Sequence, residues 1–463
     1  MTKRILGLPL STEVASAEFG DARLSKRLAR IVDDLSAAPG DSFPHAFCDD
    51  GQLEGGYRFF RNLKVTAQAI VEPHIQASIE RAAQAGGVRV VHDRSEFAPT
   101  DGVAREGFGP FRGRGNGFFG HFALAVSSDD ERQPFGVVGM DLFSRAIRPK
   151  GERKKRTAEN VESRSWYQVV EDVERRLAGR GTAVHIMDRQ ADSYDLMALL
   201  GERRFVIRLR QDRIVELPEH ERAKLSDVAE KSAAIFQREV PLSRRHPPHK
   251  SWTARQHPSR EGRLATLSFS SLAVTLNRPA SARIDTPTLT INVVRVWEPT
   301  PPPDTEPVEW LLLTNLPIEN AQQVAAIVDH YRARWLIEEF FKALKTGCRV
   351  EDRQLETAHS FQNALATFVP IAWRLLLLRH TARHSPDRPA RSVLPDSQIA
   401  VLSRLKRAKL PRKPSARDAM LAIARLGGHV SNNGDPGWQV LARGYDDLLL
   451  LEEGWSARGC DQS

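Results

Sequence analysis

Residues 87–93 read GVRVVHD and residues 182–188 read TAVHIMD, and these two stretches decide the fold class. Each is a short apolar run rich in β-branched residues, which predicts a buried strand. Each run ends at an aspartate, and ligand sites of α/β sheets collect at the carboxyl ends of strands. Asp93 and Asp188 are therefore candidate site residues, although an aspartate in this position is also typical of a helix N-cap or a turn.

Other patterns place these two runs in an α/β domain. Residues 117–127 and 136–142 have strand composition, and residues 161–177 have the periodicity of a helix. Three strands, a helix and a further strand are thus predicted up to Asp188. Roughly 150 residues separate Asp188 from the next candidate acid, which is too many for a loop. Strand-like runs in this interval predict an inserted β-rich domain at about residues 212–315.

The third candidate acid lies in residues 331–345, which read YRARWLIEEFFKALK. On one continuous helix, Tyr331, Arg334, Glu338 and Lys345 fall on a polar stripe, and apolar side chains occupy the other side. A carboxylate among cations and a phenol suits a metal ion beside a phosphate group. The alternative interpretation is an amphipathic helix whose charged side faces solvent.

Charge and cysteine content narrow the class of partner. The 463-residue chain carries 67 Lys and Arg against 58 Asp and Glu, a net charge of +9, which favours an anionic partner. Three basic clusters, at residues 148–156, 244–263 and 404–417, fit contact with a long polyanion. The three cysteines form neither a zinc spacing nor a disulfide framework, which suits a reducing cytoplasm. No apolar stretch predicts a membrane span, so we expect no membrane partner.

The polar stripe, in the order Tyr, Arg, Glu, Lys, resembles the Y-R-E-K signature of DDE transposases of the Tn-five type, the IS-four group of bacterial insertion sequences. The resemblance extends over nearly the whole chain. One departure is Arg94, which follows Asp93 where the family usually has Thr. Further segments that resemble the family are GGYRFFRN at 55–62, DRQAD at 188–192, WLLLT at 310–314 and AMLAIARLGG at 419–428.

This resemblance implies an α/β fold with a ribonuclease-H-like catalytic core at residues 86–380. The β-rich domain at about 212–315 is expected as an insertion in that core. The resemblance also implies a helical DNA-end-binding domain at residues 1–80 and a helical C-terminal dimerisation region at residues 396–463.

Residue by residue, the resemblance assigns catalysis and metal binding to Asp93, Asp188 and Glu338. Mg²⁺ prefers carboxylate oxygens, which fits these three acids. The resemblance implies two Mg²⁺ ions, with Mn²⁺ as a substitute and Asp188 as the bridging ligand. Trp310 is implied as a residue that stacks on a displaced base, although a Trp at the start of a strand is more often a core residue. The DNA-binding candidates are Tyr331, Arg334, Lys345, Trp310, Arg208, Arg23, Arg27, Arg58 and Arg61.

The implied function is cut-and-paste DNA transposition by a homodimer bound to double-stranded DNA. The enzyme would bind element ends, nick them, form a hairpin and transfer the 3′-OH ends to target DNA. Two alternatives stay open: an inactive transposase relative that acts as a DNA-binding repressor, and a metal-dependent nuclease without strand joining. We expect the protein in a bacterial cytoplasm, associated with DNA.

Overall fold

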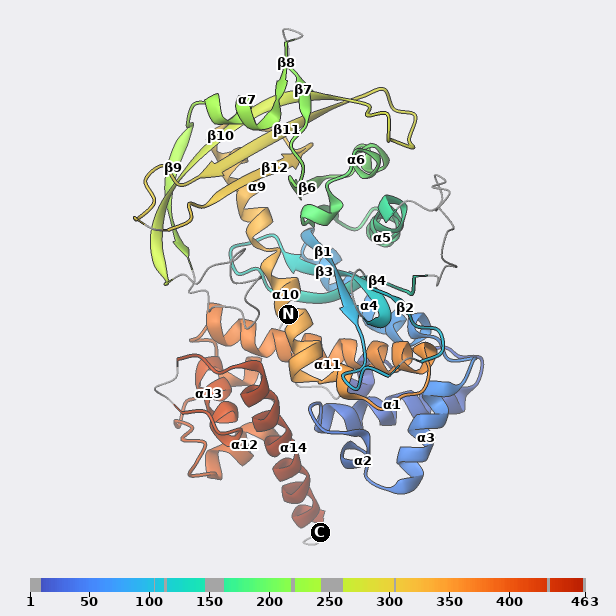
Figure 1. Ribbon diagram of the computed structural model, residues 1–463. Coiled ribbons are helices and arrows are strands. Elements are labelled where there is room, and N and C mark those ends of the chain that lie inside the picture. Colours follow the sequence, from blue (N-terminus) through green and yellow to red (C-terminus); the bar gives the residue numbers. More distant parts are fainter. Residues whose placement is uncertain are drawn as a thin grey trace. The chain divides into compact units, whose positions relative to one another are not determined.

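The computed structural model divides the chain into two compact units (Figure 1). Unit 1 takes in residues 1–154, 171–182 and 335–463, and unit 2 takes in residues 155–170 and 183–334. The structure describes residues 10–103, 105–111, 115–145, 162–217, 221–242, 261–303, 305–430 and 434–460. All of the basic cluster at 148–156 and most of that at 244–263 therefore lie outside the described residues.

The N-terminal part of unit 1 is helical. Side chains of Asp21, Asp49 and Thr66 cap three of its helices by accepting backbone N–H groups, which satisfies donors that a helix start leaves unpaired. Phe59 and Phe60 are buried, so they are core residues rather than exposed stacking groups. The elements are η2 (Leu10–Glu13), α1 (Ala22–Ala37), α2 (Phe43–Ala46), α3 (Asp50–Arg61) and α4 (Ala67–Gln84).

Three long strands of unit 1 form an antiparallel sheet in the order β1, β3, β4, and the short β2 pairs with the start of β3. β1 pairs with β3 as far as Phe97, so Asp93 lies inside the strand. The prediction that the strand ends at Asp93 is wrong, because residues 94–97 continue the backbone pairing although most of them are polar. The strands are β1 (Gly87–Phe97), β2 (Gly109–Pro110), β3 (Asn116–Ser127) and β4 (Pro134–Phe143).

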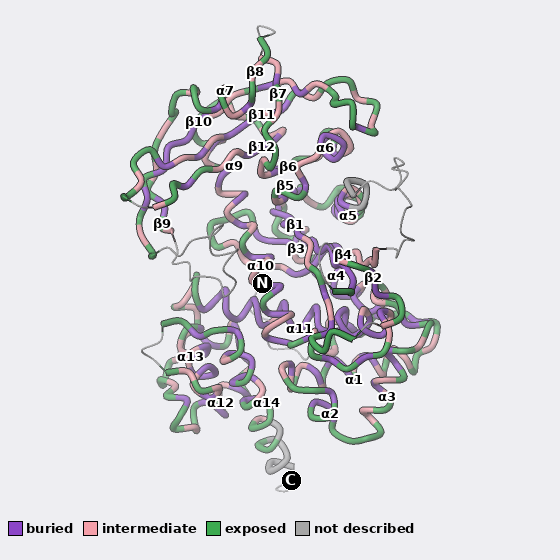
Figure 2. The backbone as a smooth tube through the Cα atoms, in the orientation of Figure 1, coloured by how far each residue is buried: buried purple, intermediate pink, exposed green. Residues whose placement is uncertain are grey.

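A long buried helix forms the centre of unit 1. α11 (Ala358–His384) is buried along most of its length, as Figure 2 shows. It is long and apolar enough to cross a membrane, but 89% of its apolar window is buried inside the protein, as is typical of a core helix. The sequence predicted no apolar segment long enough to cross a membrane. That prediction of length is wrong, because the helix continues through Pro370 and Arg374.

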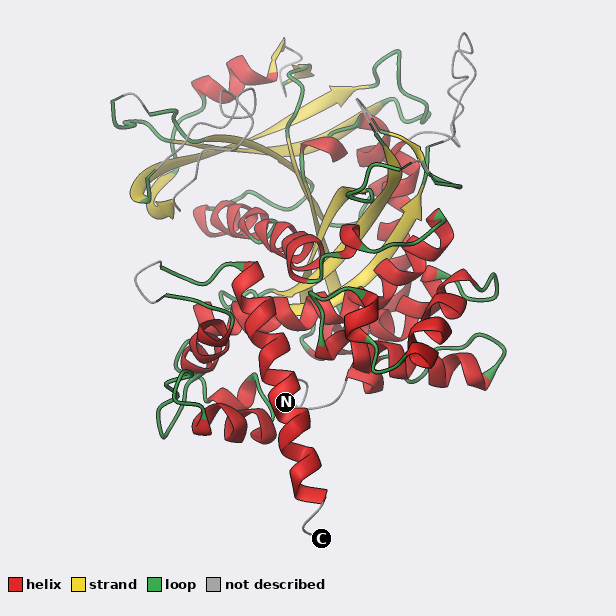
Figure 3. Cartoon of the chain, turned by 60° about the horizontal axis from the view of Figure 1, so that its bottom comes forward, coloured by secondary structure: helices red, strands yellow, loops and turns green. Residues whose placement is uncertain are grey.

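The C-terminal part of unit 1 is also helical, and Figure 3 shows how helices make up most of this unit. Two glycines let α13 and α14 approach backbone to backbone. A Cβ atom at Gly444 would lie 1.8 Å from the Ile423 carbonyl oxygen, and one at Gly427 would lie 2.0 Å from that of Val440. Only glycine fits at such a crossing. The helices are α12 (Asp396–Arg404), α13 (Ala416–Leu426) and α14 (Trp438–Cys460), after the short η7 (Ala390–Ser392).

Unit 2 is built on a mixed sheet with the strand order β5, β6, β12, β11, β10, β7, β8, and β9 also pairs with β10. β5 and β6 are parallel, and the other pairs are antiparallel. A hydrophobic core, which includes Met197, Leu225 and Val293, packs α6 and α7 on the sheet. The strands between Ile214 and Thr314 occupy the interval of the predicted β-rich insertion.

The elements of this part of the chain alternate between helices and short strands before the longer strands of the sheet. The helical elements are α5 (Glu162–Leu177), whose residues are divided between the units, η4 (Arg189–Ala191), α6 (Tyr194–Leu200), α7 (Leu225–Lys231) and α9 (Ala321–Arg332). The strands are β5 (Thr182–Met187), β6 (Phe205–Arg208), β7 (Ile214–Glu216), β8 (Arg222–Lys224), β9 (Phe236–Leu242), β10 (Arg263–Asn277), β11 (Thr288–Trp297) and β12 (Glu309–Thr314).

The predicted continuous helix over residues 331–345 is wrong. α9 ends at Arg332, because the N–H groups of Ala333 and Arg334 bond to carbonyls three residues back and form a turn. α10 (Trp335–Lys342) then begins, and a π-helical turn, η5 (Ala343–Gly347), follows it. Its i→i+5 bond runs from the Cys348 N–H to the Ala343 carbonyl at 2.7 Å. The four residues of the expected stripe therefore do not share one face of one helix.

A buried polar network fastens the N-terminal segment to the sheet of unit 1. Glu13 accepts hydrogen bonds from His74 and Arg81, each at 2.8 Å. The Val137 N–H donates to His74 Nε2 at 3.1 Å, which places the imidazole proton on Nδ1, facing Glu13. Burial raises the pKa of Glu13, but the hydrogen bonds and charges of His74 and Arg81 outweigh it and lower the pKa to about 2.

We predict that Glu13→Gln lowers the free energy of unfolding by roughly 2 to 3 kcal/mol at neutral pH. Because the folded-state pKa of Glu13 lies below its ordinary value of 4.5, its contribution is complete above that pH and is lost as the pH falls toward 2. Urea unfolding at neutral and acidic pH measures this. The exposed Glu18→Gln is the control, and a deficit in Glu13→Gln that does not shrink in acid contradicts the network.

Candidate active site

Asp93 lies on the face of the unit 1 sheet that α10 covers. It is directly opposite Phe122 in the antiparallel pairing, so both side chains project from the same face. The Phe122 ring contacts Phe340 and Phe341 of α10, with ring centroids 5.7 Å apart in both cases. Glu338 belongs to the same helix. Aromatic packing therefore holds Asp93 and the helix of Glu338 on one side of the sheet.

Arg94 projects from the opposite face of this sheet. Successive side chains of a strand alternate between faces, and Arg94 is opposite His121, which is in turn opposite Asp141. Its guanidinium lies over the Phe143 ring, 5.5 Å from the centroid. Burial, and then the charge of Arg94, hold the pKa of His121 well below its usual range. The departure from the family pattern at residue 94 therefore leaves the face of Asp93 unchanged.

Lys345 reaches the far end of β1 from the π-helical turn. Its ammonium group donates to the Glu96 carbonyl oxygen and lies 3.3 Å from the Glu351 carboxylate. It also lies over the Phe97 ring, 4.7 Å from the centroid. Phe97 is four residues from Asp93 on the same strand and therefore shares its face. The structure thus places Lys345, Asp93 and α10 on one face of β1.

Glu339, next to Glu338 in α10, is bound by side chains from two other helices. Glu339 accepts from Arg379 of α11 and, at 3.2 Å, from Trp438 of α14, and it also pairs with Lys342. Burial raises the pKa of Glu339, but the hydrogen bond of Lys342 and the surrounding positive charges outweigh it and lower the pKa. Glu339 therefore ties three helices together, which the sequence reasoning did not predict.

Asp188 directly follows β5, so the predicted strand end is confirmed here. Its carboxylate accepts the Gln190 N–H at 2.8 Å and caps the short helical turn η4. The strand-end and capping interpretations therefore both describe this residue. The cap fixes the direction of the carboxylate at the edge of the unit 2 sheet.

Four predicted DNA-binding residues gather near Asp188 in unit 2. The buried Tyr331 packs edge-on against the half-buried Trp310, with ring centroids 5.8 Å apart. Burial raises the pKa of Tyr331, the charges of Arg334 and Arg208 lower it, and the charge of Asp188 raises it. These groups are therefore close enough to interact electrostatically, although they come from a strand end, two other strands and the end of α9.

Arg189 joins this cluster and was not among the predicted site residues. Burial lowers the pKa of Arg208, the charge and hydrogen bond of Tyr331 oppose this, and the charges of Arg189 and Arg334 lower the pKa further. Three guanidinium groups this close repel one another, and a phosphate group relieves that repulsion. The available sequence signal was the position of Arg189 directly after Asp188.

The other aspartate of the DRQAD run has a structural role. The Asp192 side chain is fully buried and accepts the Arg210 N–H at 2.7 Å and the Gln211 N–H at 3.1 Å. It also accepts from the guanidinium of Arg213. Asp192 therefore fixes the loop after β6, the strand that carries Arg208.

The predicted N-terminal arginines differ in exposure. Arg23 is almost fully exposed and pairs with Asp21, and Arg58 is exposed and pairs with Glu54. Arg61 is half-exposed, pairs with Glu356 at 2.8 Å and lies over Tyr57. Arg27 lies against Gly55 of α3 and donates to Gln52 at 3.0 Å, which gives it a role in packing α1 on α3.

The predicted metal ligands divide between the units, with Asp93 and Glu338 in unit 1 and Asp188 in unit 2. Within the described residues, no group of three or more His, Cys, Asp or Glu side chains is arranged to hold a metal ion. The donor chemistry of the three residues fits Mg²⁺, since all three are carboxylates and none is a sulfur or imidazole ligand. Their role as a metal site stays a prediction.

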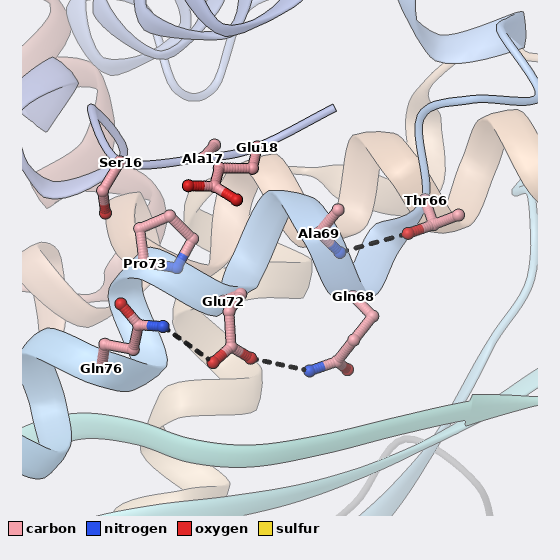
Figure 4. Close-up of a pocket in the computed structure, with 9 residues that line it drawn as sticks. All are labelled: Ser16, Ala17, Glu18, Thr66, Gln68, Ala69, Glu72, Pro73 and Gln76. Atoms are coloured by element: carbon pink, nitrogen blue, oxygen red, sulfur yellow. Dashed lines mark hydrogen bonds between the residues drawn. The ribbon is translucent and has the colours of Figure 1, made fainter. Parts of the chain in front are cut away.

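A pocket of about 480 Å³ lies away from these acids, between the segment after η2 and the start of α4 (Figure 4). Glu72 in its wall accepts from Gln68 at 3.2 Å and from Gln76 at 3.1 Å, and it pairs with Arg176. The lining has carboxylates and amides but no cation, so it is unsuited to phosphate. The lining residues are Ser16, Ala17, Glu18, Thr66, Gln68, Ala69, Glu72, Pro73 and Gln76.

Comparison with known families identifies two parts of the chain. Residues 10–65 match the transposase DNA-binding family, and residues 154–369 match the transposase DDE domain family. These two segments therefore resemble the DNA-binding and DDE domains of transposases. Asp188 and Glu338 lie inside the DDE match, whereas Asp93 precedes it. These matches, with the mixed sheets and flanking helices, confirm the expected α/β, ribonuclease-H-like fold class.

One solved structure resembles the chain at low similarity. The cryo-EM structure of the piggyBac transposase synaptic complex with hairpin DNA has 10% sequence identity and a TM-score of 0.32. The alignment covers 83% of this chain and 80% of that chain. The likeness is too distant to bear on the function.

We predict that Asp192→Asn destabilises the protein by about 1 to 3 kcal/mol, because its fully buried side chain loses its pairing with the partly buried Arg213 and the charge on its hydrogen bonds to two backbone N–H groups. Asp188→Asn, four residues earlier, is the matched control and is expected to cost about 1 kcal/mol or less, the value of a weakened cap. Urea unfolding followed by circular dichroism measures both. Equal stability of the two variants would contradict the structural role of Asp192.

Proposed function

We propose that this chain, with the DNA-binding and DDE domains of a transposase, is a cut-and-paste transposase of the Tn-five type. It binds the ends of its element, nicks them, forms a hairpin and transfers the 3′-OH ends to target DNA. The observation that carries the proposal is the convergence of Asp93, α10 with Glu338, and Lys345 on one face of β1. α10 and Lys345 lie inside the segment that matches the DDE family, and Asp93 precedes it.

Asp93, Asp188 and Glu338 are proposed to hold two Mg²⁺ ions, with Mn²⁺ as a substitute. DDE domains depend on divalent metal ions, which activate the attacking hydroxyl and stabilise the departing 3′ oxygen when bound. The cap at Asp188 and the central position of Asp93 in β1 support the proposal, because both hold a carboxylate on a rigid element. A Mg²⁺ ion that also contacts phosphate usually needs only one or two carboxylates, so three acids suffice for two ions.

The cations near these acids are proposed to hold the DNA strand. Arg208 and Arg334 lie near Tyr331, Arg189 lies near Arg208, and all three suit bidentate contact with phosphate. Lys345 contributes a single point charge at the end of β1. Trp310, half-buried against Tyr331, is proposed to stack on a displaced base during hairpin formation.

The N-terminal region is proposed to recognise the element end. Its match to the DNA-binding family includes Arg23, Arg58 and Arg61, which are exposed, and Arg27, which is partly buried. Two protein copies are proposed to bridge two ends, with the C-terminal helices forming the homodimer in the DNA complex. Exposed apolar residues in the second half of α14, Leu450 and Trp455, support that assignment.

We predict that Asp93→Asn, Asp188→Asn and Glu338→Gln each abolish nicking and joining of a labelled element end in Mg²⁺, while end binding persists. The matched control is Arg94→Thr, because the Arg94 side chain faces away from Asp93. This variant should change the nicking rate less than tenfold, which corresponds to about 1.4 kcal/mol of activation free energy.

The same assay separates the alternatives. Cleavage by the wild-type protein without joining identifies a nuclease, and binding without cleavage identifies a repressor. Residual cleavage by one acid variant removes that residue from the site, and loss of nicking in Arg94→Thr contradicts the two-face arrangement of β1.

We predict that Trp310→Ala slows hairpin formation about 5- to 150-fold, the equivalent of 1 to 3 kcal/mol of base stacking, and leaves nicking nearly unchanged. Trp310→Phe should recover part of the rate, because a smaller ring still stacks. Gel analysis of nicked and hairpin products gives both rates. An equal loss in both steps assigns Trp310 to the packing of Tyr331 instead.

A further inference from the structure

The connection between α12 and α13 carries an unbalanced positive charge. Residues 397–417 contain no acid. Five cations lie in an eight-residue stretch of this connection, residues 406–413, and we call these five residues the basic loop. They are Lys406, Arg407, Lys409, Arg412 and Lys413.

All five side chains of the basic loop belong to exposed residues. Within the described residues none of them takes part in an ion pair, whereas many exposed arginines of unit 1 do. Arg175 pairs with Asp172 at 2.7 Å, Arg349 with Asp352 at 2.7 Å and Arg388 with Glu131 at 2.7 Å. The basic loop thus lacks the neutralisation that is usual on this surface, and its charges repel one another.

The basic loop has a fixed backbone. Ala408 in its middle is fully buried, and its carbonyl accepts from the Arg425 guanidinium of α13 at 2.9 Å. Lys409 adopts φ of 51°, a left-handed conformation that is uncommon for a residue with a Cβ atom. At the other end, the Pro414 carbonyl accepts the Ala390 N–H at 2.9 Å, and Ser415 and Asp418 form a capping box. The cations are therefore presented by an anchored loop.

The basic loop is separate from the region that matches the DNA-binding family. In unit 1, α12 and α13 lie to one side of α14, and α1 to α3 lie to the other side (Figures 1 and 3). Both α12 and α13 pack on α14. A duplex bound to residues 10–65 therefore uses a different surface from a duplex bound to the basic loop.

We propose that the basic loop binds the phosphate backbone of target DNA without reading its sequence. The inference rests on the proposed transposase function, because only a strand-joining enzyme needs a second duplex that is not an element end. Unpaired Lys and Arg side chains suit this partner, since each phosphate contact releases counterions from DNA. Target duplexes vary in sequence, and the basic loop offers charges rather than amide or aromatic side chains.

The test uses the full chain and a fluorescent duplex of arbitrary sequence that lacks the element end. The variant Lys406→Gln/Arg407→Gln/Lys409→Gln should reduce the slope of log K against log salt concentration by about 0.9 for each phosphate group that the protein no longer neutralises. The matched control Arg175→Gln/Arg180→Gln/Lys231→Gln removes the same charge elsewhere and should keep the wild-type slope. A conservative Lys406→Arg/Lys409→Arg variant should also keep it, which separates charge from folding.

Strand-transfer assays then identify which duplex is bound. The proposal predicts that the glutamine variant nicks the element end at the wild-type rate but joins it to a plasmid more slowly. An unchanged salt slope overturns the proposal, and so does an equal loss of nicking and joining, which assigns the basic loop to the element end. If the wild-type protein does not join ends at all, the transposase function fails, while the salt slope still reports whether the basic loop binds DNA.

Discussion

The packing of α10 on the sheet of unit 1 is the constraint on which the candidate site depends. An eight-residue helix is too short to be stable alone, so α10 exists because Phe340 and Phe341 are buried against Phe97 and Phe122. This packing places Glu338 and Asp93 on one side of β1. The π-helical turn that follows brings Lys345 to the end of the same strand. Such turns are often found at functional sites.

Buried acids elsewhere hold this framework in place. Glu13, Asp192 and Glu339 each accept from two or more donors, and each connects elements that are distant in sequence. Removing one partner from such a network leaves a buried charge uncompensated, which is why these acids serve structure. Asp188 accepts the Gln190 N–H and caps η4. The partners of Glu13, Asp192 and Glu339 thus show which carboxylates stabilise the framework.

The two units supply different parts of the proposed chemistry. Unit 1 contributes two acids, a lysine and the region that matches the DNA-binding family. Unit 2 contributes Asp188 with Tyr331 and the arginines near Tyr331 and Arg208. The basic loop adds a third cationic surface in the C-terminal part of unit 1. Separate cationic surfaces are suited to an enzyme that handles more than one duplex.

The sequence by itself determined the α/β class, the strand that ends at Asp188 and the candidate acids, because these features depend on local periodicity and residue type. Strand length at Asp93 depends on pairing with β3, so the polar residues 94–96 misled the prediction. The break at Ala333 depends on local turn bonds that the amphipathic pattern does not record. Only the tertiary structure decided that Arg94 faces away from Asp93, and that Glu339 binds Arg379. Sheet faces and side-chain partners are set by elements far away in the chain, and no local pattern encodes them.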